Sequence, residues 1–386
     1  MRVTNFSEIF IKEFFSNNFR KGYVHKKKLI PEPKNIMSIK ILNDMLSVRD
    51  YWNNKNFKMV LDRKSISYAD FSSFFLEHST NNLRPDVDKV QNLISRGSSI
   101  VLSEIEKLNS KLYDIVEEIQ GFTNGKCQGN LYFSMESRQA FGPHCDDHDV
   151  FAIHFEGEKV WNIYENIETN PINHPMFKYS SEERTKRAGK LIDQITLQPG
   201  DLLYLPRGQY HDALASKNGA IHIAFGLTYF KPIDMLSLLW EKIVLNEYMR
   251  EDFKENLTEL DLSNHLKKMS IELSEIINNK ENIMLADKSI KNWPYKLNRY
   301  SLNEIMTKGK EYKVDNSIKI QQNGTEVLLG NAKSNVLIPS HFVEIVKFVL
   351  KHDLIFHKDI LDNFKELKKE IVLECLNNLE KMKVIT

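Results

Sequence analysis

The 386-residue chain contains little cysteine, no excess of charge and no long apolar run. Its three cysteines, Cys127, Cys145 and Cys375, are far apart and form no CxxC pair, so no disulfide framework is expected. The 53 basic and 52 acidic side chains leave a net charge of +1, which argues against nucleic-acid binding because phosphate contacts require a basic excess. The sequence has no window of about 18 consecutive apolar residues, so no membrane span is expected.

The N-terminal stretch from Met1 to Phe15 is interrupted by Glu8, Lys12 and Glu13, which is not the pattern of a secretory signal peptide. Together with the scattered cysteines, this predicts a cytoplasmic protein. The apolar fraction of 41% and the charged fraction of 27% are those of an ordinary globular protein. The length predicts two or three domains.

Four regions differ in their sequence pattern. Residues 86–120 carry apolar residues every three or four positions, which predicts helix, with a break expected at Gly97. Residues 128–229 are rich in aromatic and β-branched residues between turn residues, which predicts an all-β sandwich or barrel. We expect its strands at 130–134, 150–155, 160–164, 194–197, 202–205 and 220–227.

Helical patterns return at 235–249 and 260–277, with a weaker piece near Leu302. Residues 311–386 combine short strands at 327–329, 336–338 and 384–385 with helices at 341–350, 358–364 and 369–379, which predicts a winged helix. This last region has as many lysines as acidic residues, so contact with protein is expected rather than binding to DNA.

Two segments of the β-rich region contain potential metal ligands. In Gly142-Pro143-His144-Cys145-Asp146, a strand would direct the side chains of His144 and Asp146 to the same face. In the segment 199–211, a turn at Pro199-Gly200-Asp201, a buried strand and a second turn at Pro206-x-Gly208 would direct His211 into the barrel. Two histidines and one carboxylate that leave coordination positions open are typical of non-haem Fe(II) oxygenases.

These segments resemble the JmjC-type cupins, and more narrowly the ribosomal oxygenases among the 2-oxoglutarate-dependent hydroxylases. The motifs that carry the resemblance are Phe141-Gly142-Pro143-His144-x-Asp146, Glu156-Gly157-Glu158-Lys159-Val160-Trp161, and the segment from Pro199 to His211. The resemblance implies that His144, Asp146 and His211 bind Fe(II) and that Lys159 pairs with the distal carboxylate of 2-oxoglutarate. We expect Lys159 to follow a turn at Glu156-Gly157 and to enter a strand beside the metal ligands.

Several other residues of this region are candidate site residues. The resemblance places polar contacts to the cosubstrate on the strand of Asn130 and Tyr132, although filling of the barrel would also explain both residues. His222 alternates with apolar residues and is expected to point inward, either to the cosubstrate or as a hydrogen-bonded core histidine. We do not expect His148 or His154 to bind metal, and we expect Asp147 and Asp149 at the barrel mouth, with Arg207 near the substrate entrance.

The expected fold is α+β: a double-stranded β-helix with flanking helices over residues 1–231, a helical dimerisation region over 232–310, and a winged helix over 311–386. The resemblance implies a dioxygenase that uses Fe(II), 2-oxoglutarate and O2 to hydroxylate a side chain of a protein or peptide, either arginine or histidine of a ribosomal protein or a residue of a biosynthetic peptide. It also implies a homodimer. Two alternatives stay open, a demethylase of N-methyl-lysine and a non-enzymatic binding scaffold.

Overall fold

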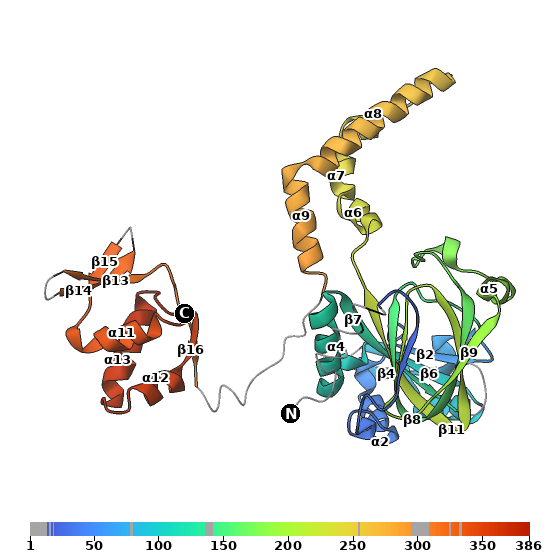
Figure 1. Cartoon of the computed structure of the whole chain (residues 1–386), viewed down its shortest axis with the longest axis horizontal. Helices are drawn as coiled ribbons and strands as arrows, with labels where there is room; N and C mark the ends of the chain where they lie inside the picture. The colour runs from blue at the N-terminus through green and yellow to red at the C-terminus, as the bar shows by residue number, and fades with distance from the viewer. Residues whose placement is uncertain are drawn as a thin grey trace. The chain divides into compact units, whose positions relative to one another are not determined.

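The largest element of the structure is an antiparallel sheet of nine strands in the order β1-β10-β8-β11-β7-β6-β2-β3, with β9 paired to β8 (Figure 1). The computed structural model describes residues 14, 17, 19–77, 80–135, 142–253, 255–294, 309–323, 326–331 and 334–386. The strands of the sheet are β1 (Val24–Lys26), β2 (Phe57–Leu61), β3 (Lys64–Ser65), β6 (Ser99–Ser103), β7 (Lys126–Ser134), β8 (Asp149–Ile167), β9 (Leu191–Leu197), β10 (Leu202–Leu205) and β11 (Gln209–Thr228). A separate hairpin is formed by β4 (Ser72–Glu77) and β5 (Thr80–Pro85). The chain divides into two compact units, residues 1–297 and 298–386.

Two long strands organise the sheet. β8 has 19 residues and β11 has 20, and the two pair along most of their length. On its other side, β8 pairs first with β10, through residues 150–153, and then with β9, through residues 159–164. The strands predicted at 150–155 and 160–164 are therefore one continuous strand, and the strand predicted at 220–227 begins at Gln209.

Gly157 marks an irregularity inside β8, and no turn is found there. Its φ of +71° is left-handed, and a Cβ added to it would lie 2.0 Å from the Gly219 carbonyl oxygen of β11. The register between the two strands shifts close by, between Ala215 and Ala220. A second register shift lies between Ile221 and His222, which pair with Glu156 and His154, so Phe155 is an extra residue of β8. Val150 and Ala152 before this bulge therefore share one buried cluster with Trp161 and Ile163 after it, although strict alternation would separate even from odd positions.

Residues 86–120 form two helices with a strand between them, so the prediction of helix throughout is wrong at 99–103. α3 (Val87–Ser95) is followed by Gly97, whose φ is +91°, and the Ser98 amide donates to the Leu93 carbonyl. The next residues form β6, which pairs with β2 on one side and β7 on the other. Pairing on both sides overrides the helical spacing of Val101 and Leu102.

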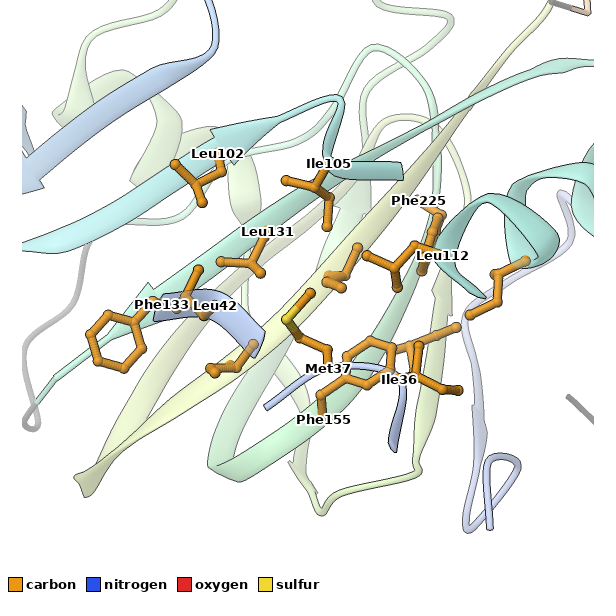
Figure 2. Packing of buried hydrophobic residues seen from close by; sticks show 14 of the residues in the cluster. Ile36, Met37, Leu42, Leu102, Ile105, Leu112, Leu131, Phe133, Phe155 and Phe225 are labelled. Atoms are coloured by element: carbon orange, nitrogen blue, oxygen red, sulfur yellow. The ribbon is translucent and has the colours of Figure 1, made fainter. Parts of the chain in front are cut away.

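The outer face of the sheet is covered by the N-terminal helices, α2 (Ile39–Leu46) and α4 (Ser110–Thr123). The Asn109 side chain accepts hydrogen bonds from the Lys111 and Leu112 amides and so begins α4. Figure 2 shows how strand residues such as Leu102 and Leu131 pack against Met37 and Leu112 of the covering segments. This core holds the sheet in place behind the cavity described below.

Residues 232–291 form a set of helices with many exposed apolar side chains. They are α6 (Pro232–Leu238), α7 (Trp240–Leu245), α8 (Glu259–Asn278) and α9 (Lys280–Lys291), and α5 (Ser181–Ala188) lies earlier, between β8 and β9. The predicted helix 235–249 is thus divided, α9 was not predicted, and the piece near Leu302 lies outside the described residues. None of the helices in the described part of the chain has the length and apolar character needed to cross a bilayer.

The second unit has its own core. Its strands are β12 (Glu311–Lys313), β13 (Lys319–Asn323), β14 (Glu326–Asn331), β15 (Ser334–Leu337) and β16 (Leu354–Phe356), and its helices are α11 (Val343–Val349), α12 (His357–Asn363) and α13 (Lys369–Lys381). The predicted strands and helices of this region are confirmed to within a few residues, with Ile385 bridged to Val314, while β12, β13 and β16 were not predicted. Ile345, Val349, Ile360 and Leu376 of the three helices are among its buried residues.

Candidate metal centre

One group of potential metal ligands is found among the described residues: His144, Asp146 and His211. One donor atom from each lies within 4.8 Å of the others. His211 lies near the start of β11, after the predicted turn, but His144 and Asp146 lie in an irregular segment. The prediction that His144 and Asp146 share a strand face is therefore wrong, and their positions come from backbone contacts to β11 and the turn before it.

Three backbone hydrogen bonds hold these residues together. The His144 amide donates to the His211 carbonyl at 3.0 Å, and the His211 amide donates to the His144 carbonyl at 2.8 Å. The Gly208 amide donates to the Asp146 carbonyl at 3.0 Å. Gly208 has a φ of +87°, and a Cβ there would lie 2.0 Å from the Glu168 carbonyl oxygen, so the turn before His211 requires glycine.

Each histidine of the group has one ring nitrogen engaged by the backbone. Nδ1 of His144 lies 2.9 Å from the Gly142 carbonyl, and Nδ1 of His211 lies 3.0 Å from the Gln209 carbonyl. Because a carbonyl only accepts, both Nδ1 atoms carry the proton in the neutral rings. The Nε2 lone pairs are then left for a metal, as in many protein metal sites.

The electrostatics favour a neutral imidazole beside a carboxylate. Burial lowers the pKa of His211 to about 4, and the neighbouring His144 contributes in the same direction. Burial opposes ionisation of Asp146, but His148, His211 and His144 outweigh it and hold the pKa of Asp146 below its usual value. Asp146 is therefore ionised and His211 unprotonated at neutral pH, the states in which both bind metal ions.

The three residues line a cavity of about 200 Å³ beside the sheet. Its other lining residues are Tyr132, Val150, Lys159, Trp161, Ala213, His222 and Ala224. Trp161 belongs to the motif around Lys159, but no role in the site is predicted for it from the sequence. It lies two positions beyond Lys159 on β8, a spacing that signals a shared face, and its ring is stacked on His211 with centroids 5.6 Å apart.

Lys159 is the cation of this cavity. It is 5% exposed, and burial lowers its pKa to about 7. Asp146 is the one acidic residue of the lining, and no ion pair involves Lys159 among the residues that the structure describes. Its ammonium lies 3.4 Å from Nδ1 of His222. A buried ammonium of this kind is costly unless an anion joins it.

The other predicted site residues differ in whether they line the cavity. Tyr132 and His222 both line the cavity. Asn130 is on the same side of β7 as Tyr132 but is not among the lining residues. His154 is fully buried, with Nε2 at 2.9 Å from the Gly157 carbonyl, and lies outside the metal-ligand group. His148 is also outside it, with Nδ1 at 2.7 Å from Asp147.

Asp149 is completely buried, so its expected place at the barrel mouth is wrong. Its carboxylate accepts hydrogen bonds from the Arg20 guanidinium at 3.0 Å and from the Tyr204 hydroxyl at 2.9 Å. It therefore connects the N-terminal segment to β10 and has a structural role. Arg207 donates to the Pro171 and Asn170 carbonyls and fastens the segment after β8 to the turn before β11.

Comparison with known proteins identifies one domain and several partial relatives. Residues 102–235 match the JmjC domain. The chain is 27% identical over 224 residues to the bifunctional lysine-specific demethylase and histidyl-hydroxylase NO66 of Dictyostelium discoideum, covering 56% of this chain and 40% of that protein. It is 30% identical over 156 residues to ribosomal oxygenase 2 of Bos taurus, covering 40% of this chain and 30% of that protein. The chain thus spans less than half the length of these two relatives.

Solved structures show the same fold. Escherichia coli YcfD matches with a TM-score of 0.52 at 15% identity, over 97% of both chains. A complex of YcfD, a ribosomal oxygenase, with cobalt and 2-oxoglutarate matches with a TM-score of 0.50 at 14% identity, again over 97% of both chains. The sequence match confirms for residues 102–235 the JmjC domain that the motifs indicated; the relatives matched include ribosomal oxygenases, and the architecture is that of the YcfD fold.

Proposed function

We propose that this protein is an Fe(II)- and 2-oxoglutarate-dependent oxygenase that hydroxylates an amino-acid side chain of a protein or peptide. The observation that carries the proposal is the pairing of two features in one small cavity. A group of two imidazoles and a carboxylate lies there together with a buried ammonium that has no acidic partner among the described residues.

The donor set fits a ferrous ion. His144, Asp146 and His211 would supply two nitrogens and one oxygen, and the remaining coordination positions would stay open. The bound iron, with 2-oxoglutarate and O2, supplies the oxidising chemistry, in which one oxygen atom goes to the substrate and one to succinate. The protein positions the reactants and excludes water from the barrel.

Lys159 fits the far end of a dicarboxylate. A 2-oxo acid that chelates the metal with its keto acid group would direct its other carboxylate into the same cavity, where the ammonium donates charge-assisted hydrogen bonds. Pairing with a carboxylate also relieves the cost of burying the ammonium. A scaffold without catalytic function has no need of this arrangement, which is why we place the binding-only alternative behind the enzyme.

The substrate class rests on the relatives. One is named a histidyl-hydroxylase and another a ribosomal oxygenase, so the side chain of a ribosomal protein is the leading substrate, and a modified peptide is the next. The name of the first relative also includes lysine demethylation. Hydroxylation leaves one added oxygen on the product, whereas demethylation releases formaldehyde.

The test is a reconstituted reaction. The purified protein with Fe(II), 2-oxoglutarate and air is incubated with ribosomal proteins from cells that lack this gene, and succinate, formaldehyde and protein mass are measured. We expect succinate together with the mass gain of one oxygen atom on one protein. Asp146→Ala should abolish both signals, while Asp147→Ala, which removes a neighbouring carboxylate outside the metal-ligand group, should retain most of them. Unchanged turnover in Asp146→Ala would refute the proposal, and formaldehyde without a hydroxylated product would favour the demethylase.

The proposal includes a homodimer formed through residues 232–310. Support comes from large apolar side chains that are exposed on the helices of this region, among them Trp240 at 60%, Leu245 at 71%, Leu260 at 69% and Met284 at 63%. Trp240→Glu should shift the protein toward monomer in sedimentation equilibrium, whereas Met176→Glu, at an even more exposed position outside this region, should not. A monomeric wild-type protein would contradict this part.

The remaining parts of the proposal concern the second unit and the location. Residues 311–386 act as a winged helix that contacts protein, because the unit is electrically balanced, and residues 1–231 act as the catalytic domain. The three widely spaced cysteines support a reducing, cytoplasmic setting.

A further inference from the structure

Three aromatic rings lie in a row across neighbouring strands, and two of them, Tyr132 and His222, line the cavity. His222 on β11 is the cross-strand partner of Tyr132 on β7 and of His154 on β8. The His222 ring is nearly parallel to both, with an interplanar angle of 8° to Tyr132 and 10° to His154, and the centroids are 4.8 Å and 6.4 Å away. Trp161 meets the same ring edge-on at 5.3 Å. The orientation of His222 is therefore determined on several sides by packing.

While Lys159 is protonated, its contact with His222 has one polarity. An ammonium only donates, so Nδ1 of His222 accepts from Nζ of Lys159 over their 3.4 Å separation. The ring is then neutral and carries its proton on Nε2. Burial, together with Lys159 and His154, holds the pKa of His222 well below its usual value, in agreement with a neutral ring.

Within the described part of the chain, the Lys159 side chain has no other polar contact than that to His222. Its four-carbon chain is flexible, and holding it in one rotamer requires an anchor at its end. Among the described residues, the Nδ1 atom of His222 is the anchor that the structure provides. The His222 ring is held in place by the packing of Tyr132, His154 and Trp161. The direction of the Lys159 ammonium within the cavity therefore follows from the position of His222.

We propose that His222 is a positioning residue that fixes the Lys159 ammonium and thereby sets the length of the 2-oxo dicarboxylate that the cavity accepts. This inference rests on the proposed function, because it concerns the same cosubstrate site. His222 acts through Lys159 and not on the reacting atoms. It should therefore affect ligands with a distal carboxylate and leave unchanged those that lack one.

The experiment measures binding and needs no turnover. Protein loaded with Mn(II) under anaerobic conditions is titrated calorimetrically with 2-oxoglutarate, with the shorter oxaloacetate and the longer 2-oxoadipate, and with 2-oxobutyrate, which has no distal carboxylate. His222→Phe retains a ring for the stack but has no acceptor, whereas His222→Asn offers an amide oxygen near the position of Nδ1. His222→Leu provides a second variant without an acceptor, and circular dichroism checks that each variant is folded.

We expect His222→Phe and His222→Leu to weaken 2-oxoglutarate binding about tenfold, the scale of one hydrogen bond to a charged group. Discrimination among the three dicarboxylates should shrink, 2-oxobutyrate binding should stay as in wild type, and His222→Asn should recover part of the loss. Adding His222→Phe to Lys159→Met should cause no further loss, because the two residues act as one unit.

Two results separate the inference from the function on which it rests. If Lys159→Met weakens 2-oxoglutarate binding and the acceptor-free His222 variants do not, the inference is wrong and the proposed function stands. An equal loss for 2-oxobutyrate in these variants would also overturn the inference, because His222 would then act at the metal end. If Lys159→Met binds 2-oxoglutarate as tightly as wild type, the cosubstrate assignment itself fails.

Discussion

Replacing Lys159 by methionine should stabilise the ligand-free protein while removing its ability to bind a dicarboxylate. The side chain is 5% exposed, and burial lowers the pKa of Lys159 from 10.5 to about 7. Each pKa unit corresponds to about 1.4 kcal/mol, so keeping this group protonated in the folded state costs about 5 kcal/mol. Methionine has a similar length and carries no charge. The variant also loses the contact with His222, but the free energy of that contact is small compared with the cost of burying the ammonium.

The pH dependence isolates this effect. Between about pH 7 and pH 10.5 the unfolded chain keeps a proton on Lys159 that the folded protein has lost, so the stability of wild type rises with pH in this window. The advantage of Lys159→Met should therefore be largest at or below pH 7 and should fall by about 1.4 kcal/mol per pH unit above it. From pH 7 to pH 9 the difference in unfolding free energy should shrink by about 2–3 kcal/mol.

Urea unfolding monitored by tryptophan fluorescence provides the assay. All four tryptophans of the chain, at positions 52, 161, 240 and 293, belong to the unit of residues 1–297, so the signal reports on that unit alone. A chelator and the omission of keto acids keep the cavity free of ligand. Lys58→Met, at an exposed position on β2, is the matched control and should show no comparable slope. A stability difference for Lys159→Met that does not change with pH, or a destabilised variant at pH 7, would refute the reasoning.

Three further substitutions test the framework around the site. Gly208→Ala places a Cβ 2.0 Å from the Glu168 carbonyl oxygen at a φ of +87°. It should lower the free energy of unfolding in urea by at least about 2 kcal/mol and weaken Mn(II) binding. Gly22→Ala is the control and should be nearly neutral, because no atom lies within 4 Å of the added carbon. Leu131→Ala removes a fully buried side chain from the core behind the cavity and should cost about 2–5 kcal/mol; a cost below about 1 kcal/mol would mean that the sheet does not pack there as described. Asp149→Ala leaves the buried Tyr204 hydroxyl without its acceptor and should cost about 1–3 kcal/mol, and a cost in the Tyr204→Phe background equal to that in wild type would contradict this explanation.

Much of the candidate site was predictable because its chemistry depends on residue type. The motifs around His144, Asp146 and His211 named the three residues that lie within 4.8 Å of one another. The glycine turn before His211 was also predictable, since a left-handed φ strongly favours glycine. The motif around Lys159 named a lysine that lines the same cavity.

The errors share a cause, which is that local pattern does not reveal distant pairing. Residues 99–103 have helical spacing and yet form a strand, because β2 and β7 offer hydrogen bonds on both sides. Glu156-Gly157 reads as a turn and yet lies inside β8, because β11 runs alongside and accommodates the irregularity. Asp149 reads as a loop residue and is buried, because its partner Arg20 comes from a segment more than a hundred residues away.

The sequence by itself therefore determined which atoms are available: the two imidazoles and the carboxylate, the lysine, the order of the motifs, and the β-rich character of residues 128–229. These follow from side-chain chemistry and from turn residues, which act over a few positions. Tertiary structure alone decided which side chains share the cavity. The extra residue of β8 at Phe155 exchanges the faces of the strand, so that Lys159 and Trp161 point inward with Val150, and cross-strand register places His222 between Tyr132 and His154. Register depends on hydrogen bonds between strands far apart in the chain, and a single-residue shift would exchange the inner face for the outer one.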